Sequence, residues 1–155
     1  HYTSIKYFEA IENSIREDFT FLNHILEICN EMIYKLIKPI ALHVRRTDYL
    51  QVAKEFILAE EYYSEALTHF GGDQPVIVFS DDPEWCKRQE IFLSERFTVS
   101  SNNNIIDLCL MSLCAGHIIC CSTFSWWGAW LANSEKVIAS KNYPKEYYPS
   151  SWVSI

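Results

Sequence analysis

The chain has 155 residues, 49% of them hydrophobic, and it is therefore long enough to bury one hydrophobic core. Its formal net charge of -7 excludes nucleic acid as a general partner, because non-specific binding to nucleic acids depends on many lysines and arginines that displace counterions from phosphates. A single anionic ligand held by a local pair of arginines is compatible with this charge.

The N-terminal part of the chain has helical periodicity. Apolar residues recur at helical spacing in Tyr7–Ile15 and again in Leu22–Ile37, and Pro39 ends the pattern. The sequence therefore predicts a helical segment, residues 1–38, that leads into a compact domain of residues 39–155.

Beyond Pro39, short apolar runs alternate with helical patterns, which is typical of a parallel sheet with crossover helices. The predicted strands are Ile40–Arg45, Val76–Phe79, Phe97–Val99, Ile118–Cys121 and Val137–Ala139. The predicted helices are Glu60–Phe70, Pro83–Ile91, Ile105–Cys114 with Asn104 as its N-cap, and Ser125–Asn133. The tail from Lys141 is predicted to be irregular. We thus expect an α/β fold, a Rossmann-like parallel sheet of about five strands with flanking helices, whose ligand binds outside the carboxyl ends of the strands.

A long apolar stretch between Leu108 and Ala132 contains no acidic or basic residue except His117, and its length would span a bilayer. Gly116 and His117 interrupt it, and hydroxyl residues that can cap a helix precede Trp126. We therefore predict a helix, a strand, a turn and a second helix here, and no transmembrane span.

The first predicted strand ends in the sequence His-Val-Arg-Arg-Thr-Asp-Tyr, residues 43–49. Alternate side chains of a strand face opposite ways, so His43 and Arg45 share one face and Arg46 belongs to the other. One arginine can donate two charge-assisted hydrogen bonds to a phosphate, while the other turns back to a carboxylate such as Asp48. An ordinary structural ion-pair network is the alternative interpretation.

The second predicted strand is followed by Asp81 and Asp82, directly before Pro83. One of these carboxylates can cap the helix that begins at Pro83, but two are more than a cap needs. The pair is predicted to order the arginines of the first strand or to accept a hydrogen bond from a ribose hydroxyl. A divalent metal is a weaker alternative, because the pair has no further ligands in the sequence, and no metal site is predicted.

Ser122, Thr123, Phe124 and Ser125 follow the fourth predicted strand and open a helix. The free backbone N–H groups and the positive dipole end of such a start attract anions, so these residues are predicted to form the second half of a pyrophosphate clamp. Capping of the helix alone would also explain the hydroxyl residues. Asp107 lies in the first turn of the predicted helix Ile105–Cys114, where its negative charge interacts favourably with the helix dipole. If Asp107 lies in a cleft, its carboxylate can also accept the paired N–H donors of a guanine.

Three motifs together resemble those of the α-1,2-fucosyltransferases, glycosyltransferase family 11. They are residues 43–49, the run Phe-Ser-Asp-Asp-Pro-Glu-Trp-Cys-Lys at residues 79–87, and the run Ser-Thr-Phe-Ser-Trp-Trp-Gly-Ala-Trp-Leu at residues 122–131. Their order and approximate spacing also match, and the last motif is the most specific. The resemblance extends from Tyr2 to Ile155, but it covers only the C-terminal half of the family.

The resemblance implies one half of a GT-B-like fold, in an enzyme that transfers fucose from GDP-fucose to a sugar hydroxyl, typically O2 of a galactose in a glycan acceptor. Transfer proceeds with inversion, without a cofactor or an obligatory metal. On this resemblance Arg45 binds the donor's phosphates, His43 and Asp107 contact the guanosine, and the backbone of residues 123–125 completes the phosphate cradle.

Arg45, Arg46 and Asp48 are the candidate catalytic residues. Arg45 is expected to neutralise charge as GDP leaves, whereas Arg46 and Asp48 are expected to hold the scaffold. Asp48 is also the candidate general base within the chain. The chain starts at His1 and lacks the glycine-rich segment of the family's N-terminal half, so we expect a donor-binding half whose acceptor domain, and with it the acceptor site, is missing.

Two positions depart from the family pattern: Cys121 stands where Asn is usual, which removes an amide from the edge of the cradle, and Thr47 replaces a common Gly. Two other functions stay open. One is a GDP-sugar-binding module that is catalytically silent. The other is a sugar-binding surface built from the aromatic tail, with the residues Tyr143, Tyr147, Tyr148 and Trp152.

The six cysteines show no Cys-x-x-Cys spacing, and three of them lie in apolar runs, where a thiol behaves as a small hydrophobe. No signal peptide is recognisable at the start of the sequence. We therefore predict a reduced, cytoplasmic protein and leave peripheral attachment to a membrane open.

Overall fold

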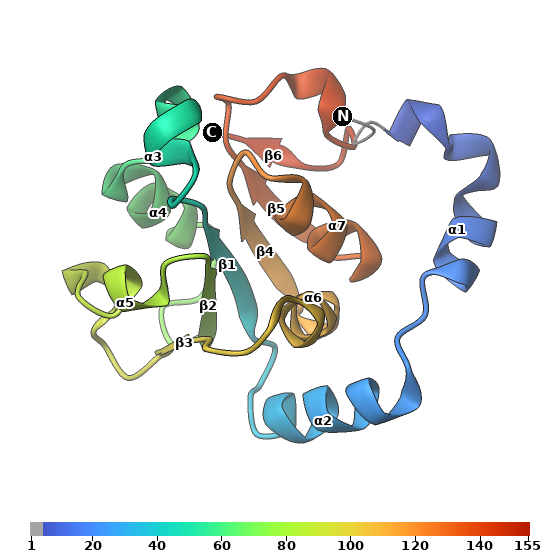
Figure 1. Ribbon diagram of the computed structural model, residues 1–155, viewed down its shortest axis with the longest axis horizontal. Helices are drawn as coiled ribbons and strands as arrows, with labels where there is room; N and C mark the ends of the chain where they lie inside the picture. Colours follow the sequence, from blue (N-terminus) through green and yellow to red (C-terminus); the bar gives the residue numbers. More distant parts are fainter. Residues whose placement is uncertain (1–4) are drawn as a thin grey trace.

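The computed structural model describes residues 5–155, which form a six-stranded sheet with helices on both faces (Figure 1). The strand order is β3-β2-β1-β4-β5-β6, and every neighbouring pair is parallel. The strands are β1 Ile40–Val44, β2 Val76–Ser80, β3 Phe97–Val99, β4 Gly116–Ile119, β5 Lys136–Ala139 and β6 Val153–Ser154. This order is that of a Rossmann sheet, in which the direction of winding reverses between β1 and β4.

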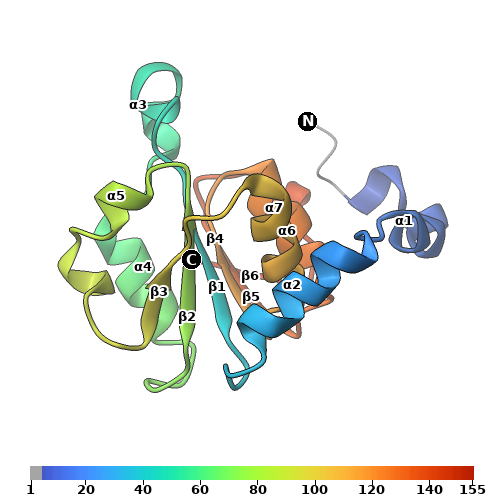
Figure 2. The same ribbon diagram turned by 60° about the horizontal axis from the view of Figure 1, so that its bottom comes forward.

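Helices fill the connections between the strands and cover both faces of the sheet. The α-helices are α1 Glu12–Asp18, α2 Asn23–Ile33, α3 Tyr49–Val52, α4 Glu60–Leu67, α5 Pro83–Cys86, α6 Asn104–Leu113 and α7 Thr123–Leu131. Short 3-10 helices cover Ile5–Tyr7, Glu9–Ile11, Lys54–Phe56, Glu90–Phe92 and Lys145–Tyr147. Figure 2 shows α4 and α5 on one side of the sheet and α2, α6 and α7 on the other.

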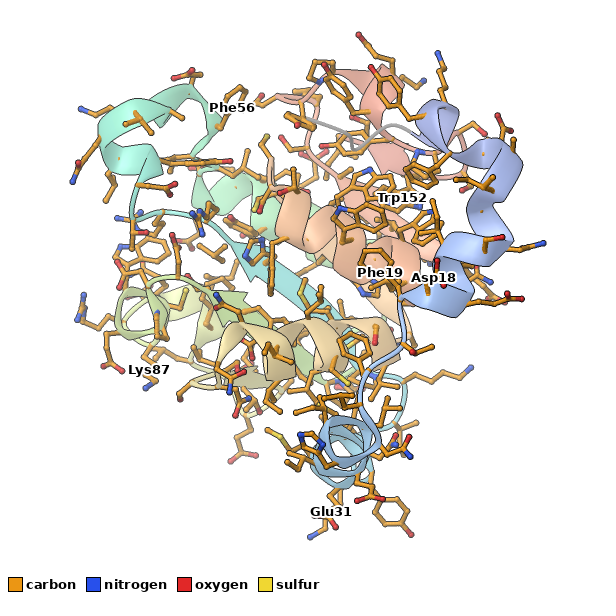
Figure 3. The ribbon with its side chains drawn as sticks, turned by 45° about the vertical axis from the view of Figure 1, so that its right-hand side comes forward. Asp18, Phe19, Glu31, Phe56, Lys87 and Trp152 are labelled. Carbon is orange, nitrogen blue, oxygen red and sulfur yellow. The ribbon has the colours of Figure 1, made fainter. Side chains whose placement is uncertain are left out.

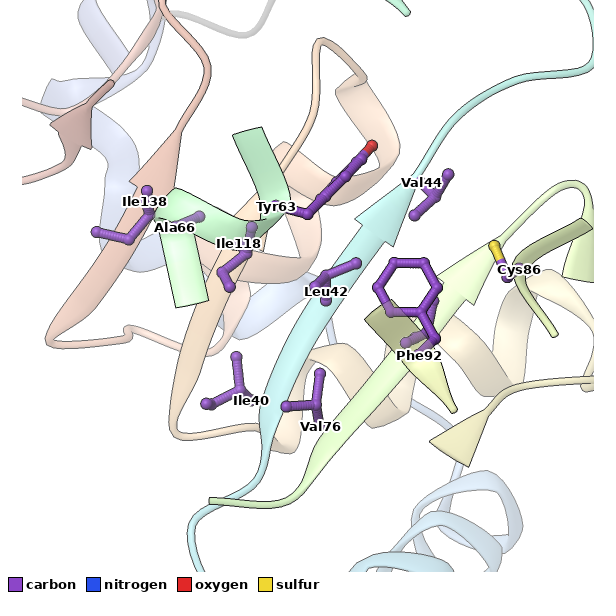
Figure 4. Close-up of a cluster of buried hydrophobic side chains, with 11 residues drawn as sticks. Ile40, Leu42, Val44, Tyr63, Ala66, Val76, Cys86, Phe92, Ile118 and Ile138 are labelled. Carbon is purple, nitrogen blue, oxygen red and sulfur yellow. The ribbon is translucent and has the colours of Figure 1, made fainter. Parts of the chain in front are cut away.

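The core under α4 and α5 is built on alternate residues of β1. Ile40, Leu42 and Val44 point to this face and pack with Tyr63 and Ala66 of α4 (Figure 4). All five residues of β1 are buried, because helices cover both faces of the strand. The sequence of the strand is therefore a nearly continuous apolar run. The alternation of side chains along β1 determines on which face of the sheet each residue after the strand lies.

The opposite face carries the intervening residues of β1. Ala41 packs beneath α6, and Cys29 of α2 packs on the outside of α6, with its Sγ 3.7 Å from the Ile106 carbonyl oxygen. α1 lies against α7, where the Arg16 guanidinium stacks 3.7 Å from the centre of the Trp130 ring. The predicted N-terminal helical segment thus covers this face, and residues 1–4 of that segment lie outside the described residues.

All five predicted strands are present, and their ends differ from the prediction by at most two residues. The tail from Lys141 was wrongly expected to be irregular throughout. Val153–Ser154 forms the sixth strand beside β5, and Lys145–Tyr147 forms a turn of 3-10 helix. A two-residue strand has no periodicity of its own, since only its pairing with a distant strand defines it.

The observed helices differ from the predicted ones at their ends; α4, for example, ends at Leu67 and not at Phe70. The helix expected over Pro83–Ile91 ends at Cys86, and a 3-10 turn follows at Glu90–Phe92. Asn103, not Asn104, is the N-cap of α6, because its extended backbone lets the side chain accept hydrogen bonds from two N–H groups of the first turn.

The long apolar stretch is divided among the end of α6, β4 and α7, as predicted. Within residues 5–155, no helix is both long enough and apolar enough to cross a bilayer.

Candidate functional site

The carboxyl ends of β1 and β4 lie side by side where the strand order reverses. From β1 the chain continues toward α3 and β2, and from β4 it continues toward α7 and β5, so the two loops part and leave a crevice between them. Residues from both loops line a cavity of about 560 Å³ at this point. The candidate site therefore lies where a Rossmann sheet binds its ligand.

Arg45 is the first residue after β1, and it lines this cavity. Its Nη2 donates to Asp48 Oδ2 over 3.0 Å, and its Nε lies 3.3 Å from Asp81 Oδ2. The hydrogen bond from Arg45 lowers the pKa of the Asp48 carboxyl. The Arg45 side chain is 32% exposed, so its planar guanidinium remains accessible to an anion.

Arg46 points to the other face of the sheet, as the alternation in β1 requires. Its guanidinium stacks 3.9 Å from the centre of the Trp85 ring, and its Nε is 3.9 Å from Asp82 Oδ2. Within residues 5–155 the buried Nε makes no hydrogen bond, so the ring and the charge of Asp82 hold this side chain. Arg46 turns back to a carboxylate as expected, but this carboxylate is Asp82 and not Asp48, which the turn into α3 brings to the face of Arg45.

Asp81 holds the loop that follows β1. Its carboxylate accepts hydrogen bonds from the backbone N–H groups of Arg46 and Thr47, at 2.9 and 3.0 Å, and from the Thr47 hydroxyl. Thr47 therefore adds a contact that glycine at this position would lack. The sequence led us to expect that Asp81 and Asp82 order the two arginines. The ion pairs of Arg45 with Asp81 and of Arg46 with Asp82 agree with that expectation.

Asp82 acts separately from Asp81, because it caps α5 by accepting from the Trp85 N–H over 3.1 Å. The two carboxylates thus have different partners. Within residues 5–155, no group of three or more His, Cys, Asp or Glu side chains is arranged to hold a metal ion.

His43 is buried at the end of β1, with 3% of its surface exposed. Its Nδ1 lies 3.1 Å from Cys120 Sγ, and its ring packs against Phe124 with 5.6 Å between the ring centres. Burial lowers the pKa of His43 to about 4 and raises that of Cys120 to about 12, so both groups are neutral at pH 7. The His43 ring can therefore offer a neutral nitrogen atom for a hydrogen bond, and it carries no charge at pH 7.

A second cavity of about 90 Å³ adjoins the first, with which it shares Arg45 and Phe124. His43 and Asp107 both line it. Asp107 Oδ1 accepts from the Ser100 hydroxyl over 2.5 Å, and burial raises the pKa of the Asp107 carboxyl. His43 and Asp107 give this space hydrogen-bonding groups that suit the polar edge of a ring.

α7 begins beside Arg45 and presents its N-terminus to the larger cavity, which Ser122, Thr123 and Phe124 line. Among the described residues, the Ser122 side chain makes no cap hydrogen bond to the helix. The first N–H groups of a helix have no partners within the helix, so they remain available to a ligand here. Ser125 is buried, and its hydroxyl donates to the Ser122 carbonyl over 3.2 Å, which stiffens the turn.

The structure brings most of the predicted site residues to these two adjoining cavities. The larger cavity contains the predicted residues Arg45, Asp48, Ser122, Thr123 and Phe124. The smaller cavity contains the predicted residues His43, Arg45, Asp81, Asp107 and Phe124. Of the predicted residues, those that line neither are Arg46, Asp82 and Ser125.

Further residues line the cavities without having been predicted as site residues, among them Tyr49, Phe56 and Asn104. Tyr49 donates from its hydroxyl to the Cys121 carbonyl over 2.7 Å and so ties the two loops together. Its place at the end of the first motif was a signal that could have found it. Phe56 offered no such signal, since only packing across the crevice brings it there.

The aromatic tail is divided between two environments. Tyr143 and Tyr147 line the larger cavity, whereas Tyr148 and Trp152 belong to the buried cluster around α7. Figure 3 shows Phe56 on the segment after α3 and Trp152 among the side chains packed near α7.

The protein family model described as "Glycosyl transferase family 11" matches residues 1–152. The chain is 34% identical over 142 residues to an α-1,2-colitosyltransferase of Escherichia coli, a match that covers 83% of this chain and 48% of that protein. It is 29% identical over 152 residues to galactoside α-(1,2)-fucosyltransferase 1 of Saimiri boliviensis boliviensis, over 84% of this chain and 41% of the relative. The chain thus spans about half the length of the curated relatives it matches.

Among solved structures, POFUT1 in complex with GDP-fucose superposes on this chain with a TM-score of 0.62 and 15% sequence identity. The match covers 78% of this chain and 46% of that one. At this identity the likeness concerns the fold, and it agrees with the expected Rossmann-like half of a GT-B-like architecture.

Proposed function

The chain belongs to glycosyltransferase family 11, and on that premise we propose that it is the donor-binding half of a fucosyltransferase, which transfers fucose from GDP-fucose to a sugar hydroxyl. One observation carries the proposal: Arg45 and the N-terminus of α7 line the same cavity at the switch point of the sheet. The two features come from loops more than 70 residues apart, and both attract phosphate.

The pyrophosphate is proposed to lie between the Arg45 guanidinium and the N–H groups that open α7. The arginine supplies a bidentate, charge-assisted contact, and the helix supplies backbone donors and the positive end of its dipole. Asp48 and Asp81 hold the guanidinium in place, which reduces the entropy lost when the ligand binds.

The guanine edge is proposed to enter the smaller cavity. There the Asp107 carboxylate can accept the paired N–H donors of guanine, and neutral His43 offers a ring nitrogen. Adenine lacks that pair of donors, so this arrangement supports a preference for GDP over ADP.

Leaving-group stabilisation is the chemistry that these residues support. Cleavage of the sugar–phosphate bond places negative charge on GDP, and preorganised donors contribute most where charge develops. Transfer with inversion also needs a base for the acceptor hydroxyl. Asp48 is the candidate on this chain, but its ion pair with Arg45 and its lowered pKa make it a weak base.

The acceptor and its domain are also part of the proposal. A galactose-containing glycan is proposed to bind mainly to a domain that this chain does not contain, because the chain spans about half the length of its relatives. The name of one relative says that it transfers colitose, so the identity of the donor sugar belongs to the proposal as well.

The division into residues 1–38 and 39–155 stays a prediction. The proposed cytoplasmic location is supported by the six free thiols.

A GDP-sugar-binding module without catalytic activity is the second candidate, and the partial coverage of the relatives favours it. Calorimetric titration with GDP, GDP-fucose and ADP, followed by an assay of fucosyl transfer to lactose, separates the two. Tight binding with turnover supports the transferase, and binding without turnover supports the module. A folded chain that binds none of the guanine nucleotides contradicts both.

A further inference from the structure

The larger cavity has an aromatic wall that the phosphate contacts do not explain. Phe56, Tyr143 and Tyr147 line it together with Arg45 and the start of α7. The rings are packed on one another, with 6.2 Å between the centres of Phe56 and Tyr143 and 5.1 Å between those of Tyr143 and Tyr147. Figure 1 shows α3 and the C-terminal segment at the same end of the sheet.

The tyrosines of this wall differ from their neighbours in hydrogen bonding. Tyr49, Tyr62 and Tyr148 each donate from the hydroxyl to a backbone carbonyl, at 2.7, 2.6 and 3.1 Å. The hydroxyls of Tyr143 and Tyr147 make no hydrogen bond to any of residues 5–155, although both side chains are partly buried. Two phenol groups are thus available to a ligand in the larger cavity.

We propose that this wall is the subsite for the hexopyranosyl group of the nucleotide sugar, an inference that rests on the proposed function. A pyranose ring has an apolar face of C–H groups and a rim of hydroxyls, which suits rings that carry free phenol groups. A 6-deoxy sugar also carries a methyl group, which aromatic carbon accommodates without an unsatisfied polar atom.

The position of the wall agrees with the covalent structure of the donor. The sugar is attached directly to the diphosphate, so its subsite must adjoin Arg45, and the wall shares one cavity with that guanidinium. A volume of about 560 Å³ falls within the range of about 300–1,000 Å³ that is typical of small-molecule sites. Of the two cavities, the aromatic wall lines only the larger one.

The test compares GDP with GDP-fucose, because only GDP-fucose carries the sugar. Calorimetry on Tyr147→Ala should show an affinity for GDP-fucose that is lower by about fivefold to tenfold, with GDP affinity changed less than about twofold. Tyr34→Ala is the matched control, since Tyr34 is 85% exposed on the segment after α2, and it should leave both affinities unchanged.

Two further measurements cover the case in which Tyr147→Ala does not fold. Tyr143→Phe and Tyr147→Phe remove only the hydroxyls and should lower GDP-fucose affinity selectively. In the unsubstituted chain, the methyl protons of the fucosyl group should give nuclear Overhauser effects to aromatic protons of the wall.

Equal losses of affinity for GDP and GDP-fucose would place the nucleoside against this wall and would overturn the sugar subsite. The absence of any loss of affinity, or of any Overhauser effect, would also overturn it. These results leave the proposed function standing. An unsubstituted chain that binds neither ligand contradicts the proposed function, and the subsite with it.

Discussion

Substitution of Arg45 by alanine should abolish most of the affinity for GDP without unfolding the chain. Two charge-assisted hydrogen bonds to phosphate, at about 1.5 kcal/mol each, sum to about 3 kcal/mol, which is a loss of roughly a hundredfold in Kd. The true loss should exceed this figure, because Asp48 and Asp81 then face the phosphates without their cation.

The stability of the fold should change little in Arg45→Ala. The side chains of Arg45 and Asp48 are 32% and 50% exposed, and a solvent-exposed pair of this kind contributes at most about 1 kcal/mol. Arg45→Lys keeps the charge but not the planar fork, so its affinity for GDP should fall between those of the wild-type chain and Arg45→Ala.

Arg46→Ala is the matched control, because it removes the same charge from the adjacent residue. Loss of stacking on Trp85 should destabilise the fold by about 1–2 kcal/mol, while GDP affinity falls by no more than about threefold. Calorimetric titration with GDP and urea unfolding of each variant measure the two effects. The reasoning is refuted if Arg45→Ala stays folded and binds GDP within about fivefold of the wild-type chain, or if Arg46→Ala loses more affinity than Arg45→Ala.

Three other predictions concern the scaffold around the site. Asp81→Asn should destabilise the chain by about 1–2 kcal/mol, because the amide nitrogen that replaces one oxygen cannot accept from the Thr47 backbone; an unchanged urea midpoint would contradict the role of Asp81. Burial lowers the pKa of His117 to about 4, so between about pH 4 and 6.5 the unfolded chain binds more protons, and stability falls as the pH drops through this window by up to about 3 kcal/mol. His117→Gln should show a correspondingly smaller difference in urea midpoint between pH 7 and pH 5, and equal differences would sink the assignment. Gly128→Ala should cost about 1–3 kcal/mol, since a Cβ there would lie 2.9 Å from the Met111 Cβ, and a variant as stable as the wild-type chain would contradict this close packing.

Much of the site could be predicted because the alternation of side chains between the two faces of β1 continues into the residues that follow the strand. The period of two in β1 correctly separates Arg45 from Arg46, and the sheet order then brings the start of α7 beside Arg45. Neither inference requires contacts between distant side chains. Local pattern and topology are sufficient for both.

The remaining features depend on packing that no local pattern encodes. Asp48 pairs with Arg45 because the turn into α3 rotates it toward the crevice, and the sequence spacing fits either arginine. Phe56 reaches the cavity through its contact with Tyr143, a residue 87 positions away in the sequence. Asn103 and its neighbour are chemically identical caps, and only the backbone conformation selects between them.

The central claim is that GDP lies between Arg45 and the N-terminus of α7. The most direct test is titration of the isotope-labelled chain with GDP, followed by the shifts of its backbone amide resonances. The account predicts that the largest shifts occur at Arg45, Thr123 and Phe124. Largest shifts at the opposite end of the sheet, around Lys38 and Lys136, or no shifts at all, would contradict it.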